Sequence, residues 1–173
     1  MFSTASPGEI HLHHRRTKLK VNQASALVLS AAAAELGLGG PVIRTNASVI
    51  GQRGAESVIV ATAGWGYTVT VVLHGMRIAF TVAPRGFLRK HLVVEGTPAE
   101  QVERTVDAFH LERLRALAPL LVELSANGLR LEHRYGAPGD VVEAIQIACS
   151  LARRARHVEE QDDDTDVELA PTG

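Results

Sequence analysis

The sequence predicts an α+β fold, in which an antiparallel β-meander and a β-hairpin pack against three to four helices. Residues 45–83 alternate between apolar and polar side chains, which is typical of antiparallel strands with one buried face. The same alternation lies on both sides of Asn127-Gly128, a pair that favours tight hairpin turns because both residues tolerate positive φ. Capping signals at Thr97-Pro98 and at Asp140 indicate helices in the second half.

Length and composition allow one domain with a substantial core. The chain has 173 residues, of which 46% are apolar and 4% aromatic, so aliphatic side chains must provide most of the packing. We expect a disordered N-terminal segment over residues 1–20 and a single α+β domain over residues 21–157. That domain comprises a meander half, residues 21–84, and a helix and hairpin half, residues 85–157. No stretch approaches the ~20 apolar residues of a membrane span.

The charge is divided unevenly along the chain. Net charge is −1, yet residues 158–173 carry seven acids and no Lys or Arg, which leaves 18 basic and 12 acidic residues elsewhere. We interpret residues 158–173 as a disordered, solubilising acidic tail. The alternative is a tail that folds back over a basic surface as a counter-charge.

The N-terminal region allows two interpretations. Arg15-Arg16 precede an uncharged run from Val21 to Ala34, a pattern similar to a twin-arginine export signal with cleavage near Glu35. The same run predicts a structural helix from about Gln23 to Leu36, ended by Gly37 in a left-handed conformation. We expect a cytoplasmic protein, with export through Arg15-Arg16 as the alternative.

Four strands follow the predicted first helix. They cover residues 45–52, 56–63, 66–74 and 76–83, with glycine-containing turns between them. Pro84 ends the meander because proline cannot donate to a β-ladder.

The second half begins with a predicted strand over residues 88–95. Thr97 as N-cap, Pro98 at the first helical position and Glu100 in a capping box then predict a helix start. This helix should bury Val102, Val106 and Phe109, and a second short helix should bury Leu111, Leu114 and Leu117. After the hairpin, Asp140 and Glu143 begin a last helix that should run to about His157 and bury Val142, Ile145, Cys149 and Ala152.

The order of these features resembles a poorly characterised family of bacterial proteins. The residues that carry the resemblance are Leu36-Gly-Leu, Ile50-Gly-Gln-Arg-Gly54, His91 to Glu100 and Leu151-Ala-Arg-Arg154, within residues 24–156. Some members carry transmembrane helices before the first helix. The resemblance implies the fold and transfers no function or catalytic residue.

No pattern in the chain indicates a catalytic centre. Gly-x-Ser-x-Gly is absent, as are the His-x-x-x-His and Cys-x-x-Cys spacings of zinc sites. The only cysteine, Cys149, lies in an apolar helical context without a nearby base. We therefore expect no catalytic residue, no metal and no cofactor.

The densest basic cluster is the best candidate for ligand binding. Arg85, Arg89, Lys90 and His91 could join Arg153, Arg154 and Arg156 on a surface that binds phosphates or another polyanion, with Phe87 as a stacking residue. The alternative is a solvated loop together with arginines that complement a helix dipole. Trp65, on a glycine-flanked turn, either contacts a partner or folds over the sheet edge.

These observations favour a non-enzymatic bacterial binding or scaffold module. Its partner is an unknown protein or a second copy of the chain. The alternatives are a nucleic-acid or polyanion-binding protein that uses Arg85, Arg89, Lys90, Arg153 and Arg154, and a small enzyme with an unrecognised site.

Overall fold

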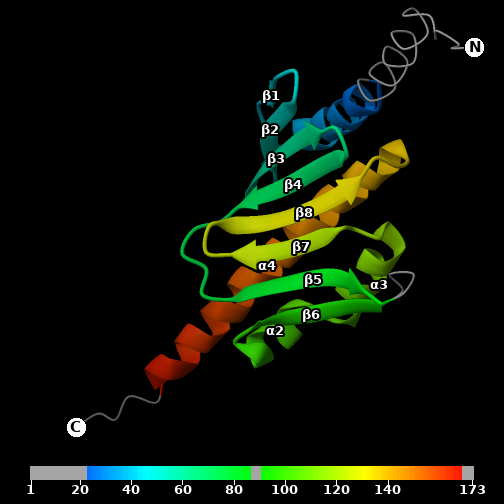
Figure 1. Cartoon of the computed structure of the whole chain (residues 1–173). Coiled ribbons are helices and arrows are strands. Elements are labelled where there is room, and N and C mark those ends of the chain that lie inside the picture. The colour runs from blue at the N-terminus through cyan, green and yellow to red at the C-terminus, as the bar shows by residue number, and fades with distance from the viewer. Residues whose placement is uncertain (1–22, 87–90, 169–173) are drawn as a thin grey trace, which may run out of the picture.

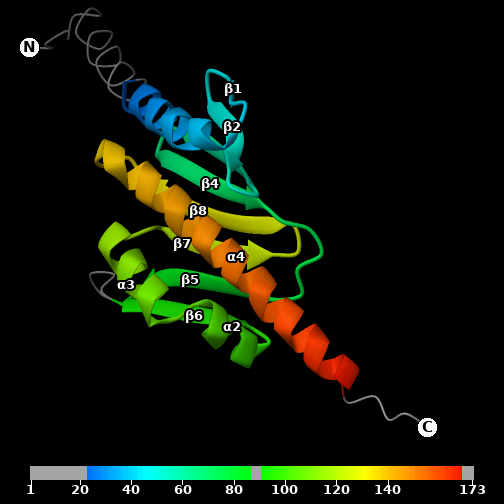
Figure 2. The same ribbon diagram turned by 180° about the vertical axis from the view of Figure 1, so that it is seen from behind.

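The computed structural model describes residues 23–86 and 91–168, and their side chains as far as residue 164. Eight strands form one antiparallel sheet, and all described helices lie on one of its faces (Figures 1 and 2). The predicted α+β class is confirmed. The opposite face carries no helix in the described part of the chain.

The sheet has the strand order β1-β2-β3-β4-β8-β7-β5-β6. All neighbouring strands pair antiparallel. The strands are β1 (Ile43–Arg44), β2 (Ser48–Arg53), β3 (Glu56–Ala63), β4 (Gly66–Val72), β5 (Ala79–Arg85), β6 (His91–Thr97), β7 (Leu121–Ser125) and β8 (Gly128–Arg134).

The predicted four-strand meander is correct for β2, β3 and β4 but wrong for the next strand. β4 pairs with β8, and β5 lies two strands further away, between β7 and β6. The connection between β4 and β5 leaves the sheet and buries Leu73, Met76 and Ile78. Alternation along a chain therefore located the strands but could not show that a later hairpin inserts between two of them.

The predicted hairpin is confirmed, but its turn lies one residue earlier than Asn127-Gly128. Ser125 pairs with Gly128, so Ala126 and Asn127 form the turn and Gly128 begins β8. Gly128 has a φ of +155°, and a Cβ atom there would lie 2.6 Å from the Val71 carbonyl oxygen of β4. The glycine serves the close approach of β8 to β4 as well as the turn.

The helices differ from prediction mainly at their ends. Residues 23–36 are helical and continue into a short 3-10 helix, η1 (Gly37–Gly39), so Gly37 does not end the helix in a left-handed conformation. Pro98, not Thr97, occupies the N-cap position of α2 (Ala99–Thr105), with no capping hydrogen bond from its side chain. Thr97 is instead held in β6, where it pairs with Ala79.

The remaining helices are α3 (Ala108–Leu117) and α4 (Pro138–Glu168). Phe109, predicted to be buried, is 59% exposed, because Asp107 caps α3 and turns His110 and Leu114 inward instead. α4 continues well beyond the predicted end at His157, so residues 158–168 are helical rather than part of a disordered tail.

The core lies between the covered face of the sheet and the helices. The strands contribute Val49, Val58, Val60, Val69, Val71, Val82, Val122, Leu129 and Leu131, all fully buried. α4 crosses the strands diagonally over this face (Figure 2) and buries Val141, Ala144, Ile145, Ile147, Ala148, Cys149, Leu151, Ala152, Ala155 and Val158. Helix 23–36 adds Val28, Leu29, Ala32 and Leu36, so it forms part of the same core.

Gly128→Ala should lower the free energy of unfolding by about 1–3 kcal/mol, because the new Cβ meets the Val71 carbonyl in an unfavourable backbone region. The matched control is Gly64→Ala, in the β3–β4 turn, where a Cβ would meet nothing within 4 Å. Urea denaturation of both variants measures the difference. Equal midpoints for the two would contradict the close contact between β8 and β4.

Candidate functional site

The uncovered face of the sheet divides into an uncharged half and a charged half. Strand register places a row of three isoleucines side by side, Ile43 on β1, Ile50 on β2 and Ile59 on β3. Ile43 is 62% exposed and Ile50 38% exposed. We call the residues of β1 to β4 on this face the uncharged half-face: Ile43, Ser48, Ile50, Gln52, Ser57, Ile59, Ala61, Ala63, Thr68, Thr70 and Val72.

The other half of the same face, on β8, β7, β5 and β6, is charged. Arg130 pairs with Glu132 on β8, and Arg85 on β5 lies 2.9 Å from Glu95 on β6. Glu123 on β7 faces Arg130 across the strands. Charged side chains are typical of a sheet face that meets water, whereas the isoleucine row is not.

The predicted basic cluster is only partly described. Arg85 ends β5 and His91 begins β6, directly opposite one another at the outer edge of the sheet. Arg85 is more than half exposed and forms an ion pair with Glu95. Arg89, Lys90 and Phe87 lie outside the described residues.

The three predicted arginines of α4 make contacts with different parts of the fold. Arg154 donates from Nε to the Arg104 carbonyl at 2.7 Å and lies 3.4 Å from Asp107. Arg156 pairs with the buried carboxylate of Glu56 on β3. Arg153 donates to the Cys149 carbonyl and lines a pocket beside Arg53. No described contact joins Arg85 or His91 to these arginines, and a shared polyanion surface stays a prediction.

Trp65 lies in the turn between β3 and β4 and is 45% exposed. Its exposure leaves the indole accessible from solvent. The predicted role as a partner contact stays a prediction.

A line of three polar residues connects α3 with α4. The His110 ring lies with Nδ1 2.7 Å from Asp107 Oδ1 and Nε2 2.9 Å from Ser150 Oγ. The Asp107 carboxylate also accepts a hydrogen bond from the His110 backbone N–H, which caps α3. The only sequence signal for this arrangement is the Asp-x-x-His spacing at a helix start, and Ser150 is 40 residues further along the chain.

This arrangement has the hydrogen-bond order of a Ser-His-Asp triad, but its surroundings do not suit acyl transfer. Such a reaction needs free N–H donors that stabilise an oxyanion. Ser150 lies inside α4, where backbone N–H groups bond to carbonyls of the preceding turn. The His110 side chain is only 4% exposed. We therefore interpret the three residues as a partly buried polar link between helices.

Burial alone would raise the pKa of Asp107, but its hydrogen bonds with His110 and the nearby charges of His110 and Arg154 hold that pKa below its usual range. Burial raises the pKa of the Cys149 thiol to about 11, so the thiolate is scarce at neutral pH. Neither observation indicates a nucleophile.

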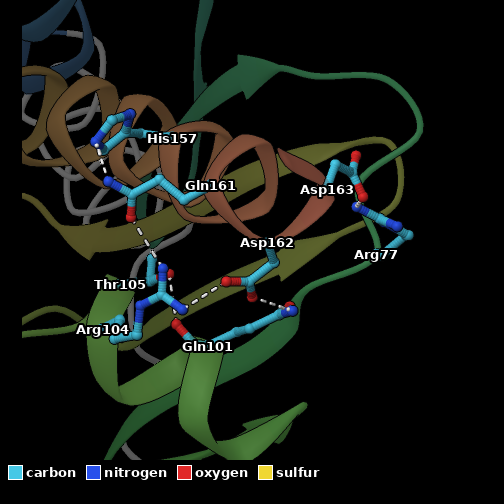
Figure 3. A network of polar contacts seen from close by, with 8 residues as sticks. All are labelled: Arg77, Gln101, Arg104, Thr105, His157, Gln161, Asp162 and Asp163. Carbon is cyan, nitrogen blue, oxygen red and sulfur yellow. Dashed lines mark hydrogen bonds and ion pairs between the residues drawn. The ribbon is translucent and has the colours of Figure 1, made fainter. Parts of the chain in front are cut away.

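The acidic end of α4 is bound to the body of the protein (Figure 3). The Glu159 carboxylate accepts hydrogen bonds from the backbone N–H groups of Arg77 and Ile78, both at 2.6 Å. The Arg77 guanidinium lies 2.6 Å from Asp163. Two acids of α4 therefore hold the connection between β4 and β5.

The same end of α4 also contacts α2. Asp162 accepts hydrogen bonds from Arg104 and Gln101, both at 2.7 Å, and Gln161 accepts one from Arg104 at 2.9 Å. The hydrogen bond from Arg104 lowers the pKa of Asp162. The acids that the sequence suggested as a loose counter-charge thus lie against Arg77 and Arg104.

Within residues 23–86 and 91–168, no group of three or more His, Cys, Asp or Glu side chains is placed to hold a metal ion. No helix in this described part of the chain is long and apolar enough to cross a membrane.

Comparisons with known proteins do not assign this chain to a family. No family model matches the chain, and no curated protein matches it. Among solved structures, the chain is similar to the crystal structure of the mycobacterial trehalose monomycolate transport factor A, TtfA. The match has 12% identity and a TM-score of 0.45, and it covers 70% of this chain and 75% of the other.

Glu159→Ala should destabilise the protein by about 1.5–3 kcal/mol, because it leaves two backbone N–H groups without their charged acceptor. Glu160→Ala is the matched control, since Glu160 is the next acid of α4 and is exposed. Denaturant unfolding of both variants compares them. If Glu159→Ala behaves like Glu160→Ala, the end of α4 does not hold the β4–β5 connection.

Asp107→Asn should lower stability at neutral pH and have progressively less effect in acid. A carboxyl whose pKa is lowered by folding stabilises the protein above its unfolded pKa, about 3.9, and loses that contribution as pH falls through the folded value. Thermal unfolding from neutral to acidic pH measures the difference between wild type and variant. A difference that stays constant into strong acid would contradict the assigned hydrogen bonds.

Proposed function

We propose that this protein is a non-enzymatic scaffold module that associates with a second copy of itself through the uncharged half-face. The observation that carries the proposal is the row formed by exposed Ile43 and Ile50 and by partly buried Ile59, on a sheet face that no described helix covers. Adjacent exposed aliphatic side chains favour burial against another surface, because burial removes their apolar area from water.

The absence of charge on this half-face favours a second copy as the occupant. In a two-fold symmetric dimer the same patch meets itself, so any charge near the axis would face a like charge. The described residues of β1 to β4 on this face include no Lys, Arg, Asp or Glu. The charged half, which carries Arg130 and Glu132 on β8 and Arg85 and Glu95 on β5 and β6, would not pair with itself as readily.

The dimensions of the half-face indicate a weak dimer. Strands lie about 4.8 Å apart and rise about 3.4 Å per residue, so four strands of this length present roughly 400 Å² of flat area. A stable complex buries about 800 Å² on each partner. We therefore expect association that depends on concentration and reverses on dilution.

The alternative functions stay as predictions. Polyanion binding through Arg85, Arg89, Lys90, Arg153 and Arg154 would need these residues to act together, and the described ones make separate contacts. An enzyme would need a nucleophile more accessible than the Asp107, His110 and Ser150 link. We retain the expected cytoplasmic location as part of the proposal.

Ile43→Glu should abolish self-association, because it places a carboxylate in the isoleucine row of the apolar contact. Ile43 belongs to the two-residue edge strand β1 and is largely exposed, so the substitution should not affect folding. Sedimentation velocity across a wide concentration range should show a wild-type mass that rises above that of the monomer and a variant that stays monomeric.

Leu27→Glu is the matched control. Leu27 is 51% exposed on helix 23–36, on the covered side of the sheet, and its substitution introduces the same charge away from the half-face. This variant should associate like the wild type. A wild-type protein that stays monomeric at every concentration, or an Ile43→Glu variant that still associates, would overturn the proposal.

A further inference from the structure

A second feature lies on the helix side of the sheet, away from the uncharged half-face. A pocket of about 250 Å³ opens between the end of helix 23–36, the β2–β3 turn and the middle of α4. Its lining combines two arginines and one carboxylate with a leucine and two glycines: Glu35, Leu38, Gly39, Arg53, Gly54 and Arg153.

Two glycines shape this pocket. η1 lies so close to β2 that a Cβ on Gly39 would lie 2.3 Å from the Gln52 carbonyl oxygen, which brings this segment beside Arg53. Gly54 has a φ of +63° in the turn after β2, and a Cβ there would meet nothing within 4 Å. The first glycine allows close packing of one wall, and the second leaves the opposite side open.

The charges around the pocket do not balance. Arg53 Nε lies 2.8 Å from Glu35 Oε1, and the same carboxylate oxygen lies 3.3 Å from Gln146 Nε2. Arg156 and Glu56 neutralise each other nearby. Arg153 donates through Nε to the Cys149 carbonyl, and no carboxylate among the described residues pairs with it. Among the side chains that the structure describes, one positive charge at the pocket therefore has no acidic partner.

The guanidinium groups also retain donors. The described contacts of Arg53 and Arg153 use only their Nε groups, at Glu35 and at the Cys149 carbonyl. Each guanidinium has two further nitrogens, which suit the paired oxygens of a carboxylate or a phosphate. Two such forks beside one opening form a recognition surface for a small oxyanion.

We propose that this pocket binds a small anion with several carboxylate or phosphate oxygens, held by Arg153 and Arg53. The volume corresponds to about eight waters at ~30 Å³ each, which suits a small organic acid or a phosphate and is below the ~300 Å³ of larger ligand sites. The ligand enters from the helix side, so the site does not depend on self-association.

Titration of the ¹⁵N-labelled full-length protein with citrate, and separately with inorganic phosphate, tests the site. Backbone amide signals of the lining residues should shift with at least one probe and saturate at millimolar concentration. Arg153→Gln should weaken that binding about tenfold, since it removes one charge-assisted fork. Saturation by citrate alone would assign the site to carboxylates, and saturation by phosphate alone would assign it to phosphates.

Arg115→Gln is the matched control, because Arg115 is an exposed arginine on α3 that does not line the pocket. It should bind the probe like the wild type, and folding of both variants is checked by their unfolding midpoints. The proposal fails if neither probe shifts the amide signals of the lining residues, or if both variants lose binding equally. Either result would mean that the two arginines do not form an anion-binding site.

Discussion

The packing of α4 across the sheet is the constraint on which the rest of the structure depends. Small side chains at Ala144, Ala148, Ala152 and Ala155, all fully buried, let the helix approach the strands closely. Polar contacts then attach three other described helices to α4: Gln146 contacts Glu35 of helix 23–36, Ser150 contacts His110 of α3, and Asp162 contacts Arg104 of α2. Helices gathered around one central helix must share one face of the sheet.

That arrangement leaves the opposite face of the sheet to other uses. On β8, β7, β5 and β6 this face carries charged residues, which are favourably placed in contact with water. Where Ile43, Ile50 and Ile59 lie in register, burial against another surface is favourable, and an uncharged patch is compatible with its own copy. The pocket beside Arg153 arises on the covered side, where α4 meets the β2–β3 turn.

Local patterns in the sequence predicted the positions of strands and helices along the chain well. They were less reliable for which of these elements lie next to one another in the fold. Alternation located β2, β3, β4, β7 and β8, because it reports which face of a strand is buried. It could not report that β8 lies beside β4, since strand order follows from how the hairpin packs under α4. The acids after His157 suggested disorder because their partners, Arg77 and Arg104, are distant in sequence. Arg153 was selected for its charge, whereas its pocket depends on Gly39 and Arg53.

α4 is one continuous helix, and its acidic end is bound to the body of the protein. Native-state hydrogen exchange of the backbone amides from Val158 to Asp164 tests it most directly. The hydrogen bonds of Glu159 and Asp162 to the β4–β5 connection and to α2 predict slow exchange, close to that of Ala148 to Ala155. Exchange at the rate of an unstructured chain beyond His157 would contradict it.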